Sequence, residues 1–266
     1  MRIKGKVGSL YLILVFGVIV LGYLMVGGFV SKFTLTPSDN SVEYEIISPT
    51  QQTEKTSLQL DSLKFRECSG VATIDLLLDR TGSMGDSTPT NQTKISRLKE
   101  AVLQLVNNLS DTSVIGIQSF DSTSRTNDIP VSYYKDVKNL IPDKVNALQP
   151  GEQTPTHDAL AFSYDILQKA KPLFKNRIFN FIFISDGQPV PDSQDPRLFN
   201  PNPADQIKAL GINVFTLAIY DSSQANDPKL ASLLKSIASK PENYYQAQDA
   251  DQVANLLQQI FTKICE

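Results

Sequence analysis

The stretch that decides the fold is residues 73–86, which read TIDLLLDRTGSMGD. Ile74–Leu78 is apolar apart from one Asp, and its length is typical of a strand that is buried on both faces. The next five residues, Asp79-Arg80-Thr81-Gly82-Ser83, alternate oxygen-bearing side chains with other residues. We therefore expect one carboxylate and two hydroxyls on a loop at the C-terminal end of a central strand, the edge at which open α/β sheets bind ligands.

Apolar runs and helical spacings alternate along the rest of the chain, and each predicts one element. Strands are expected at residues 114–120, 129–134, 178–184, 213–219 and 244–246, the second of them at a sheet edge. Helices are expected at residues 95–109, 137–148, 158–170, 204–210, 228–239 and 250–264. This alternation predicts an α/β fold: a doubly wound, mainly parallel six-stranded sheet with helices on both faces.

Two further loops carry oxygen ligands in the same order along the chain. Residues 151–160 read GEQTPTHDAL, with Thr154 shortly before a predicted helix, and Ser185-Asp186-Gly187 follows the predicted strand at 178–184. Short Asp, Ser and Thr clusters are common in turns, so one such loop alone is a weak signal. Three loops at two strand ends and one helix start are a much more specific pattern.

Together the three loops resemble the metal-ion-dependent adhesion site of von Willebrand factor type A domains, over about residues 70–264. The usual first loop is Asp-x-Ser-x-Ser, and this chain departs from it by one Thr, which keeps the hydroxyl. The resemblance implies a Mg²⁺ or Mn²⁺ ion and a protein partner that supplies an acidic residue to it. Carried over residue by residue, it assigns five positions to the metal: Asp79, Thr81, Ser83, Thr154 and Asp186.

The chemistry of these side chains suits that role. Mg²⁺ prefers an octahedral shell of oxygen ligands at about 2.1 Å and often keeps several waters. A site with few directly bound carboxylates leaves the ion electrophilic, so that an incoming carboxylate gains a large interaction. His157 is expected to line the rim of the site or to pack beside it, and Asp121 is a second candidate for the rim. The loops at residues 121–128 and 188–203 are expected to set specificity.

Catalysis is not expected from these residues. His157, the only histidine, together with Ser83 invites a hydrolase interpretation, but a nucleophile elbow needs Gly-x-Ser-x-Gly and Thr81 stands at its first Gly position. A phosphoryl-transfer site would typically need a second Asp where Arg80 stands. Three alternatives remain: an adhesion or assembly module, a hydrolase, and a structural subunit of a surface appendage, pilus-assembly or secretion complex in which metal only stabilises the fold.

The N-terminal quarter predicts membrane attachment. Residues 1–6 contain three cations and residues 7–31 contain no charged residue, and about 20 apolar residues suffice for a transmembrane helix. The positive-inside rule then places residues 1–6 in the cytoplasm and the rest of the chain outside, with a cleaved signal peptide as the competing interpretation. Residues 32–66 are rich in Ser, Thr, Gln and Pro and are expected to form a stalk before the type A domain at residues 67–266.

Charge and cysteine content add two expectations. The net charge of −3 and the lack of a basic block argue against a nucleic-acid partner. Cys68 and Cys265 flank the predicted domain, and some extracellular members of the resembled family close the domain with a disulfide at these two points. The resemblance thus implies a Cys68–Cys265 bond, and two unrelated thiols are the alternative.

Overall fold

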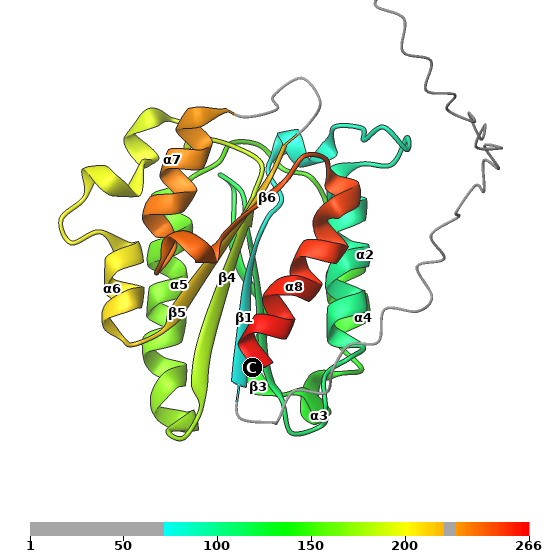
Figure 1. Ribbon diagram of the computed structural model, residues 1–266, viewed down its shortest axis with the longest axis vertical. Helices are drawn as coiled ribbons and strands as arrows, with labels where there is room; N and C mark the ends of the chain where they lie inside the picture. Colours follow the sequence, from blue (N-terminus) through cyan, green and yellow to red (C-terminus); the bar gives the residue numbers. More distant parts are fainter. Residues whose placement is uncertain (1–71, 221–226, 266) are drawn as a thin grey trace, which may run out of the picture. The chain divides into compact units, whose positions relative to one another are not determined.

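A six-stranded sheet forms the centre of the computed structural model, which describes residues 72–220 and 227–265 (Figure 1). The strand order is β3-β2-β1-β4-β5-β6, and every pair is parallel except the antiparallel pair of β2 and β3. The strands are β1 Ala72–Asp79, β2 Val114–Phe120, β3 Arg125–Tyr133, β4 Ile178–Ser185, β5 Asn213–Ile219 and β6 Tyr244–Ala247. The predicted mainly parallel six-stranded α/β sheet is confirmed.

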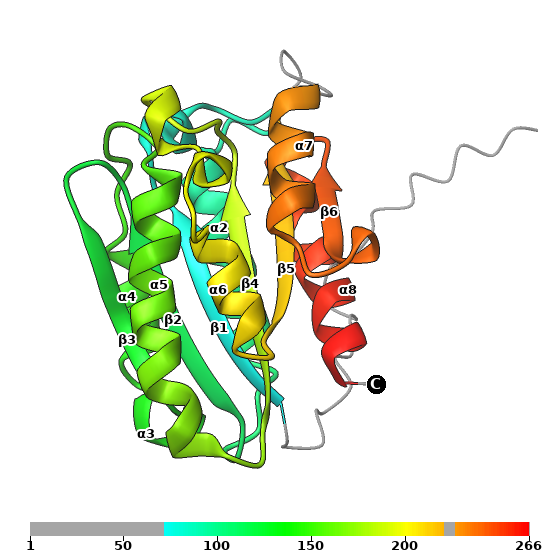
Figure 2. The same ribbon diagram turned by 90° about the vertical axis from the view of Figure 1, so that its left-hand side faces the viewer.

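Helices cover both faces of this sheet (Figures 1 and 2). One face carries α2 Lys94–Val106, α4 Ile141–Asn146 and α8 Val253–Cys265, and the other carries α5 Thr156–Ala170, α6 Pro203–Ala209 and α7 Pro228–Ile237. The short α3, Tyr134–Val137, follows β3. The 3-10 turns are η2 Gly82–Gly85, η3 Lys171–Phe174, η4 Asp192–Gln194, η5 Pro196–Leu198, η6 Pro241–Asn243 and η7 Ala250–Gln252.

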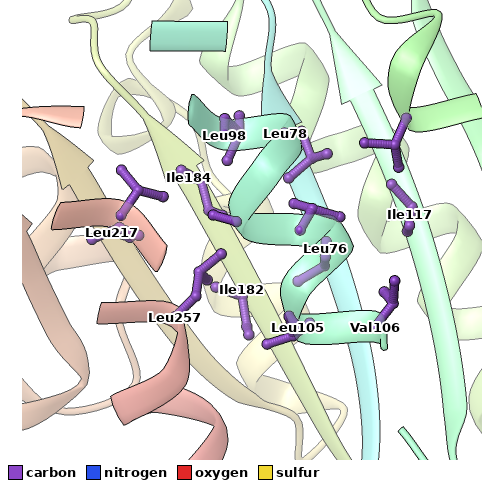
Figure 3. Close-up of a cluster of buried hydrophobic side chains, with 14 of the residues drawn as sticks. Leu76, Leu78, Leu98, Leu105, Val106, Ile117, Ile182, Ile184, Leu217 and Leu257 are labelled. Carbon is purple, nitrogen blue, oxygen red and sulfur yellow. The ribbon is translucent and has the colours of Figure 1, made fainter. Parts of the chain in front are cut away.

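The central strand β1 is apolar because it is buried from both sides. Its side chains point alternately to the two faces, so that Leu76 and Leu78 pack with the core beneath α2 and α8 while Leu77 packs with the core on the α5 side. Figure 3 shows the first of these cores, in which side chains of α2 such as Leu98 face the strand. β1 is thus an inner strand of the sheet, and its last residue, Asp79, lies at the C-terminal edge of the parallel strands.

Two sequence-based expectations were wrong in detail. The expected helix at residues 137–148 is two short helices, α3 and α4, because Pro142 lies in the first turn of α4, where a proline starts a helix rather than continues one. The expected loop at residues 121–128 is shorter, since β3 already begins at Arg125. Most of β3 is at least partly exposed, so its polar residues are those of an edge strand and gave no apolar signal.

The N-terminal predictions lie outside the described residues. They are the membrane-spanning segment at residues 7–31, the stalk at residues 32–66 and the pairing of Cys68 with Cys265. Within the part of the chain that the structure describes, no helix combines the length and apolar character that crossing a bilayer requires.

One acidic side chain of β1 is enclosed in the core. Asp75 is fully buried and accepts a 2.5 Å hydrogen bond from the Gln118 side chain, which in turn accepts one of 2.7 Å from Ser163. The second carboxylate oxygen of Asp75 has no hydrogen-bond partner among the described residues. Burial raises the pKa of Asp75 to about 7, and the Gln118 hydrogen bond only partly opposes this increase.

We predict that Asp75→Asn stabilises the protein at alkaline pH and not at acid pH. A carboxyl group whose pKa is raised by folding contributes its full stability below the unfolded pKa, and this contribution is lost as pH rises through the folded value of about 7. The free energy of unfolding of Asp75→Asn should therefore exceed that of the parent by roughly 2–4 kcal/mol at pH 8. The excess should fall toward zero at pH 4.

Urea denaturation at several pH values measures this difference. Asp165→Asn removes an exposed carboxylate from α5 and is the matched control, for which a change of under about 0.5 kcal/mol is expected. A stability difference for Asp75→Asn that does not vary with pH would contradict the raised pKa.

Candidate metal centre

Three loops meet at the C-terminal edge of the sheet. The first follows β1, the third follows β4, and the second leads into α5. Because β1 and β4 are parallel neighbours with Leu78 opposite Ile184, their next residues, Asp79 and Ser185, lie side by side. The topology thus brings together segments that are about 30 to 100 residues apart in the sequence.

Backbone hydrogen bonds hold the three loops against one another. The N–H of Gly82 donates to the carbonyl of Glu152 at 2.7 Å, and the N–H of Gly151 donates to the carbonyl of Arg80 at 2.6 Å. The third loop is joined to the second through the N–H of Val190, which donates to the carbonyl of Thr154 at 3.0 Å. The positions of the loop side chains are therefore set mainly by the backbone.

The three predicted hydroxyls lie around one space. Ser83 Oγ is 3.4 Å from Thr81 Oγ1 and donates a 2.7 Å hydrogen bond to Asp186 Oδ1. Thr154 and Ser83 both border Gly187: a Cβ built there would lie 3.1 Å from Thr154 Oγ1 and 3.9 Å from Ser83 Oγ. The structure thus brings the predicted hydroxyls together with a carboxylate beside Gly187, where a larger residue would crowd the Thr154 hydroxyl.

The two carboxylates are buried close to each other. Asp79 accepts hydrogen bonds from the Thr81 N–H at 2.8 Å and from Ser185 Oγ at 2.6 Å. Burial, together with the neighbouring charge of Asp186, raises the pKa of Asp79 to about 7. Burial also raises the pKa of Asp186, an effect that the Lys94 ammonium opposes. Both carboxylates are therefore electrostatically unfavourable where they are, and a cation between the loops would relieve this cost.

Two residues of this centre were missed by sequence reasoning. Ser185 is one, because its role depends on the neighbouring strand. Lys94 is the other: its Nζ donates a 2.8 Å hydrogen bond to Asp186 Oδ2, and its side chain is only 1% exposed. A signal for Lys94 was available, since it lies four residues before Leu98 on the buried face of α2 and a cation is unusual there.

The donor set fits a divalent cation held mainly by oxygen atoms. No group of three His, Cys, Asp or Glu side chains that could hold a metal occurs among the described residues. Hydroxyls of Ser and Thr therefore have to supply part of any coordination shell. Such a shell of hard oxygen ligands suits Mg²⁺ or Mn²⁺. The residues that would hold the ion are the five predicted ones: Asp79, Thr81, Ser83, Thr154 and Asp186.

The rim position predicted for Asp121 was wrong. Its side chain is buried, forms an ion pair with Arg80, and accepts hydrogen bonds from Thr123 and Ser124. A Cβ at Gly151 would collide with the Asp121 carboxylate at 1.8 Å. Although burial alone would raise it, these hydrogen bonds and the Arg80 charge hold the pKa of Asp121 below its ordinary value. Asp121 thus anchors the first loop and cannot reach a partner.

His157 lies partly exposed at the start of α5. Its Nδ1 is 3.0 Å from Asp158 Oδ1, and its ring stacks on Phe199 with the ring centroids 3.4 Å apart. Phe199 belongs to the segment at residues 188–202, which we call the rim loop. His157 therefore supports the rim loop, and its contacts are with Asp158 and Phe199 rather than with a serine.

Solved structures with the same fold include a protein of the mussel byssus and two pilus proteins. A proximal thread matrix protein from the mussel byssus matches with a TM-score of 0.59 and 20% identity, covering 75% of this chain and 48% of that one. This chain thus spans about half the length of that protein. A second structure of the mussel protein has a zinc-occupied metal-ion-dependent adhesion motif. It matches with a TM-score of 0.59 and 18% identity, covering 75% of this chain and 49% of that one.

Pilus proteins give similar matches. The pilus adhesin SpaC of Lactobacillus rhamnosus GG has a TM-score of 0.59 at 15% identity, over 73% of this chain and 30% of that one. The pili tip protein Mfa5 of Porphyromonas gingivalis has a TM-score of 0.56 at 13% identity, over 73% and 96%. At these identities the structures show a shared fold.

The comparison with curated proteins gave no match. The family model of the von Willebrand factor type A domain matches residues 74–262, which is most of the chain and includes all five predicted metal-binding positions. The chain therefore belongs to the von Willebrand factor type A domain family.

Proposed function

We propose that this protein binds a protein or peptide ligand through a Mg²⁺ or Mn²⁺ ion, as an adhesion or assembly module. The observation that carries the proposal is the convergence of three hydroxyls on two buried carboxylates. The hydroxyls of Thr81, Ser83 and Thr154 offer neutral oxygens, while Asp79 and Asp186 offer negative charge. A bound divalent ion would supply an electrophilic centre with room for one more oxygen ligand, best filled by a carboxylate of the partner.

The rim loop gives this module a surface for selecting its partner. Val190, Leu198 and Phe199 are exposed by 42%, 69% and 36%, all on a loop that is hydrogen-bonded to the metal-site residue Thr154. Between this loop and α7 lies a cavity of about 440 Å³, lined in part by Gln188 and Lys229. We infer that apolar residues next to the partner's acidic residue pack against this loop.

We propose that the domain is a binding module and not a catalyst. The Ser83 hydroxyl donates its hydrogen bond to Asp186, and a hydroxyl bound to a metal is a poor nucleophile. The His157 ring is hydrogen-bonded to Asp158 and stacked on Phe199. A hydrolase would instead need the histidine to accept the proton of the attacking serine.

We further propose that the N-terminal segment anchors the protein as a single-pass membrane protein with the type A domain outside the cytoplasm. This rests on the uncharged run at residues 7–31 and the cations before it. A disulfide between Cys68 and Cys265 would be compatible with that location.

A structural role is the second candidate function. The fold is shared with a pilus adhesin and a pili tip protein, so the domain could serve as a subunit of a surface appendage or secretion complex in which a metal only stabilises the fold. The two functions differ in one observable: a chelator abolishes partner binding in the first and leaves it intact in the second.

Removal of a single metal-binding side chain should abolish cation binding. In calorimetric titrations of Mg²⁺ and Mn²⁺ into the full chain we expect saturable binding, and we expect none for Asp79→Ala or Thr154→Ala, because each substitution removes an oxygen at the centre. Asp165→Ala and Thr262→Ala lie on exposed helix surfaces and are the matched controls, with unchanged affinity. Equal binding by Asp79→Ala and the parent would place the ion elsewhere.

Ligand binding should need both the ion and an acidic residue. We predict that peptides selected from a displayed library on the full chain in Mg²⁺ share an Asp or Glu and are released by a chelator. Leu198→Ser should weaken binding of a selected peptide about tenfold without changing Mg²⁺ affinity, because it removes an exposed apolar contact and leaves the ion untouched. Leu173→Ser, at an exposed leucine of η3, is the control. Chelator-resistant binding would instead support the structural role.

The proposed disulfide should be detectable as an absence of reactive thiols. Mass spectrometry after thiol labelling of the denatured, unreduced full chain should show no modified cysteine. The double substitution Cys68→Ser and Cys265→Ser should lower the free energy of unfolding by roughly 2–5 kcal/mol, because the open chain gains entropy when it unfolds. Labelling of both cysteines would show that the bond is not formed.

A further inference from the structure

We propose that Lys94 is a built-in counter-ion that weakens the binding of a free divalent cation, so that the cation and an acidic ligand bind cooperatively. This inference rests on the proposed function of the same site. Lys94 is not one of the proposed metal-binding residues, and its role would be to set the charge balance at the centre.

The contact between Lys94 and Asp186 is enclosed. Nζ lies 2.8 Å from Asp186 Oδ2, and the two side chains are 1% and 0% exposed. The other oxygen of Asp186 accepts the 2.7 Å hydrogen bond from Ser83. Both carboxylate oxygens are thus occupied by donors from the protein. Any cation that approaches Asp186 therefore meets a carboxylate that already has an ammonium partner.

The Lys94 side chain is held at this place by its helix. Lys94 is the first residue of α2, its backbone N–H donates to the carbonyl of Asp86 at 3.0 Å, and Thr93 caps the helix by accepting from the N–H of Ser96. The helix is packed against the sheet through Leu98 and its other apolar residues. With its stem buried and its backbone fixed, the Lys94 amino group has a fixed position beside Asp186.

The charges at the centre then balance only when ion and ligand are both present. When Asp79 and Asp186 are ionised, Lys94 leaves the enclosed group with a single negative charge. Asp86 Oδ2 also lies 3.9 Å from Lys94 Nζ, but the Asp86 side chain is 64% exposed, so water screens its charge and it is not counted in the enclosed group. A divalent cation changes this to a single positive charge, and a carboxylate of the partner brings it to zero. Without Lys94 the cation alone would already balance the two carboxylates, and the partner's carboxylate would add an uncompensated negative charge. In a buried site such charge differences weigh heavily.

Two roles for Lys94 predict opposite effects on metal binding. If Lys94 merely orients Asp186, its removal disorders the centre and weakens cation binding. If Lys94 acts as a counter-ion, its removal strengthens cation binding because the site becomes more negative. The sign of the change in affinity therefore separates the two.

The test is a calorimetric titration of Mg²⁺ and of Mn²⁺ into the full chain at fixed pH. We expect Lys94→Met and Lys94→Gln to bind each cation at least about tenfold more tightly than the parent. Gln retains a donor for Asp186 and is the safer variant for folding, which circular dichroism checks. Lys99→Met removes a partly exposed cation from the same helix, one that donates a hydrogen bond to the carbonyl of Asn146 and not to Asp186, and it should leave the affinity unchanged.

Thermal unfolding gives a second readout. Without divalent cations the Lys94 variants should melt below the parent, because Asp186 loses its ammonium partner in a buried place. Saturating Mg²⁺ should raise their melting temperature by more than it raises that of the parent, as tighter binding requires.

Three results would overturn either the counter-ion role of Lys94 or the proposed function of the site. If the parent binds cations and the folded Lys94 variants bind them equally or more weakly, the counter-ion role is wrong while the proposed function stands. If the parent and both folded variants bind no cation, the proposed function itself fails. A tightening that Lys99→Met shows equally would mean a general effect of net charge and would also overturn the role of Lys94.

Discussion

Parallel pairing of β1 with β4 forces two acidic side chains into one buried space, and the rest of the metal centre compensates for that constraint. Asp79 is the last residue of β1 and Asp186 is the first residue after β4, and both side chains are buried at the ends of these neighbouring strands. Hydroxyl and amide donors from Ser185, Thr81 and Ser83, and the ammonium of Lys94, each remove part of the cost. The loops place these donors around Asp79 and Asp186 because buried carboxylates are costly without hydrogen-bond or ion-pair partners.

Under the proposed function, the ion and the loops around it would contribute to recognition in different ways. An oxygen-bound divalent ion selects a chemical group, a carboxylate, and discriminates poorly between proteins that carry one. Discrimination has to come from the surroundings, and the rim loop provides apolar side chains that a fully polar metal site lacks. Its backbone is hydrogen-bonded to Thr154 and its Phe199 is stacked on His157, so this apolar surface has a fixed position relative to the ion.

The sequence predicted the sheet, and the five oxygen-bearing residues that it assigned to a metal lie together in the structure. It failed where a residue's role depends on a distant neighbour. Strands such as β1 and β4 were predictable because burial on both faces demands continuous apolar residues. The positions assigned to a metal could be located because four of them lie at or just after the ends of β1 and β4 and the fifth, Thr154, precedes the helix α5. The burial of Lys94 was signalled by its place on the apolar face of α2, but its partner Asp186 was not, and neither was the pairing of Asp121 with Arg80, because these contacts join segments far apart in the sequence. The break between α3 and α4 was signalled by a proline, whose position within the first helical turn only the structure shows.

The edges of the sheet determine how such a domain can join a larger assembly. On one side β3 contains Pro130, which has no N–H to donate, and its register with β2 is interrupted at two points. On the other side β6 has only four residues. Neither edge is a good template for an additional strand, in contrast to fibres that grow by strand exchange. Polymerisation of this kind is therefore disfavoured by the backbone itself, and contacts with other molecules fall to the loops and helices, where they can be reversible.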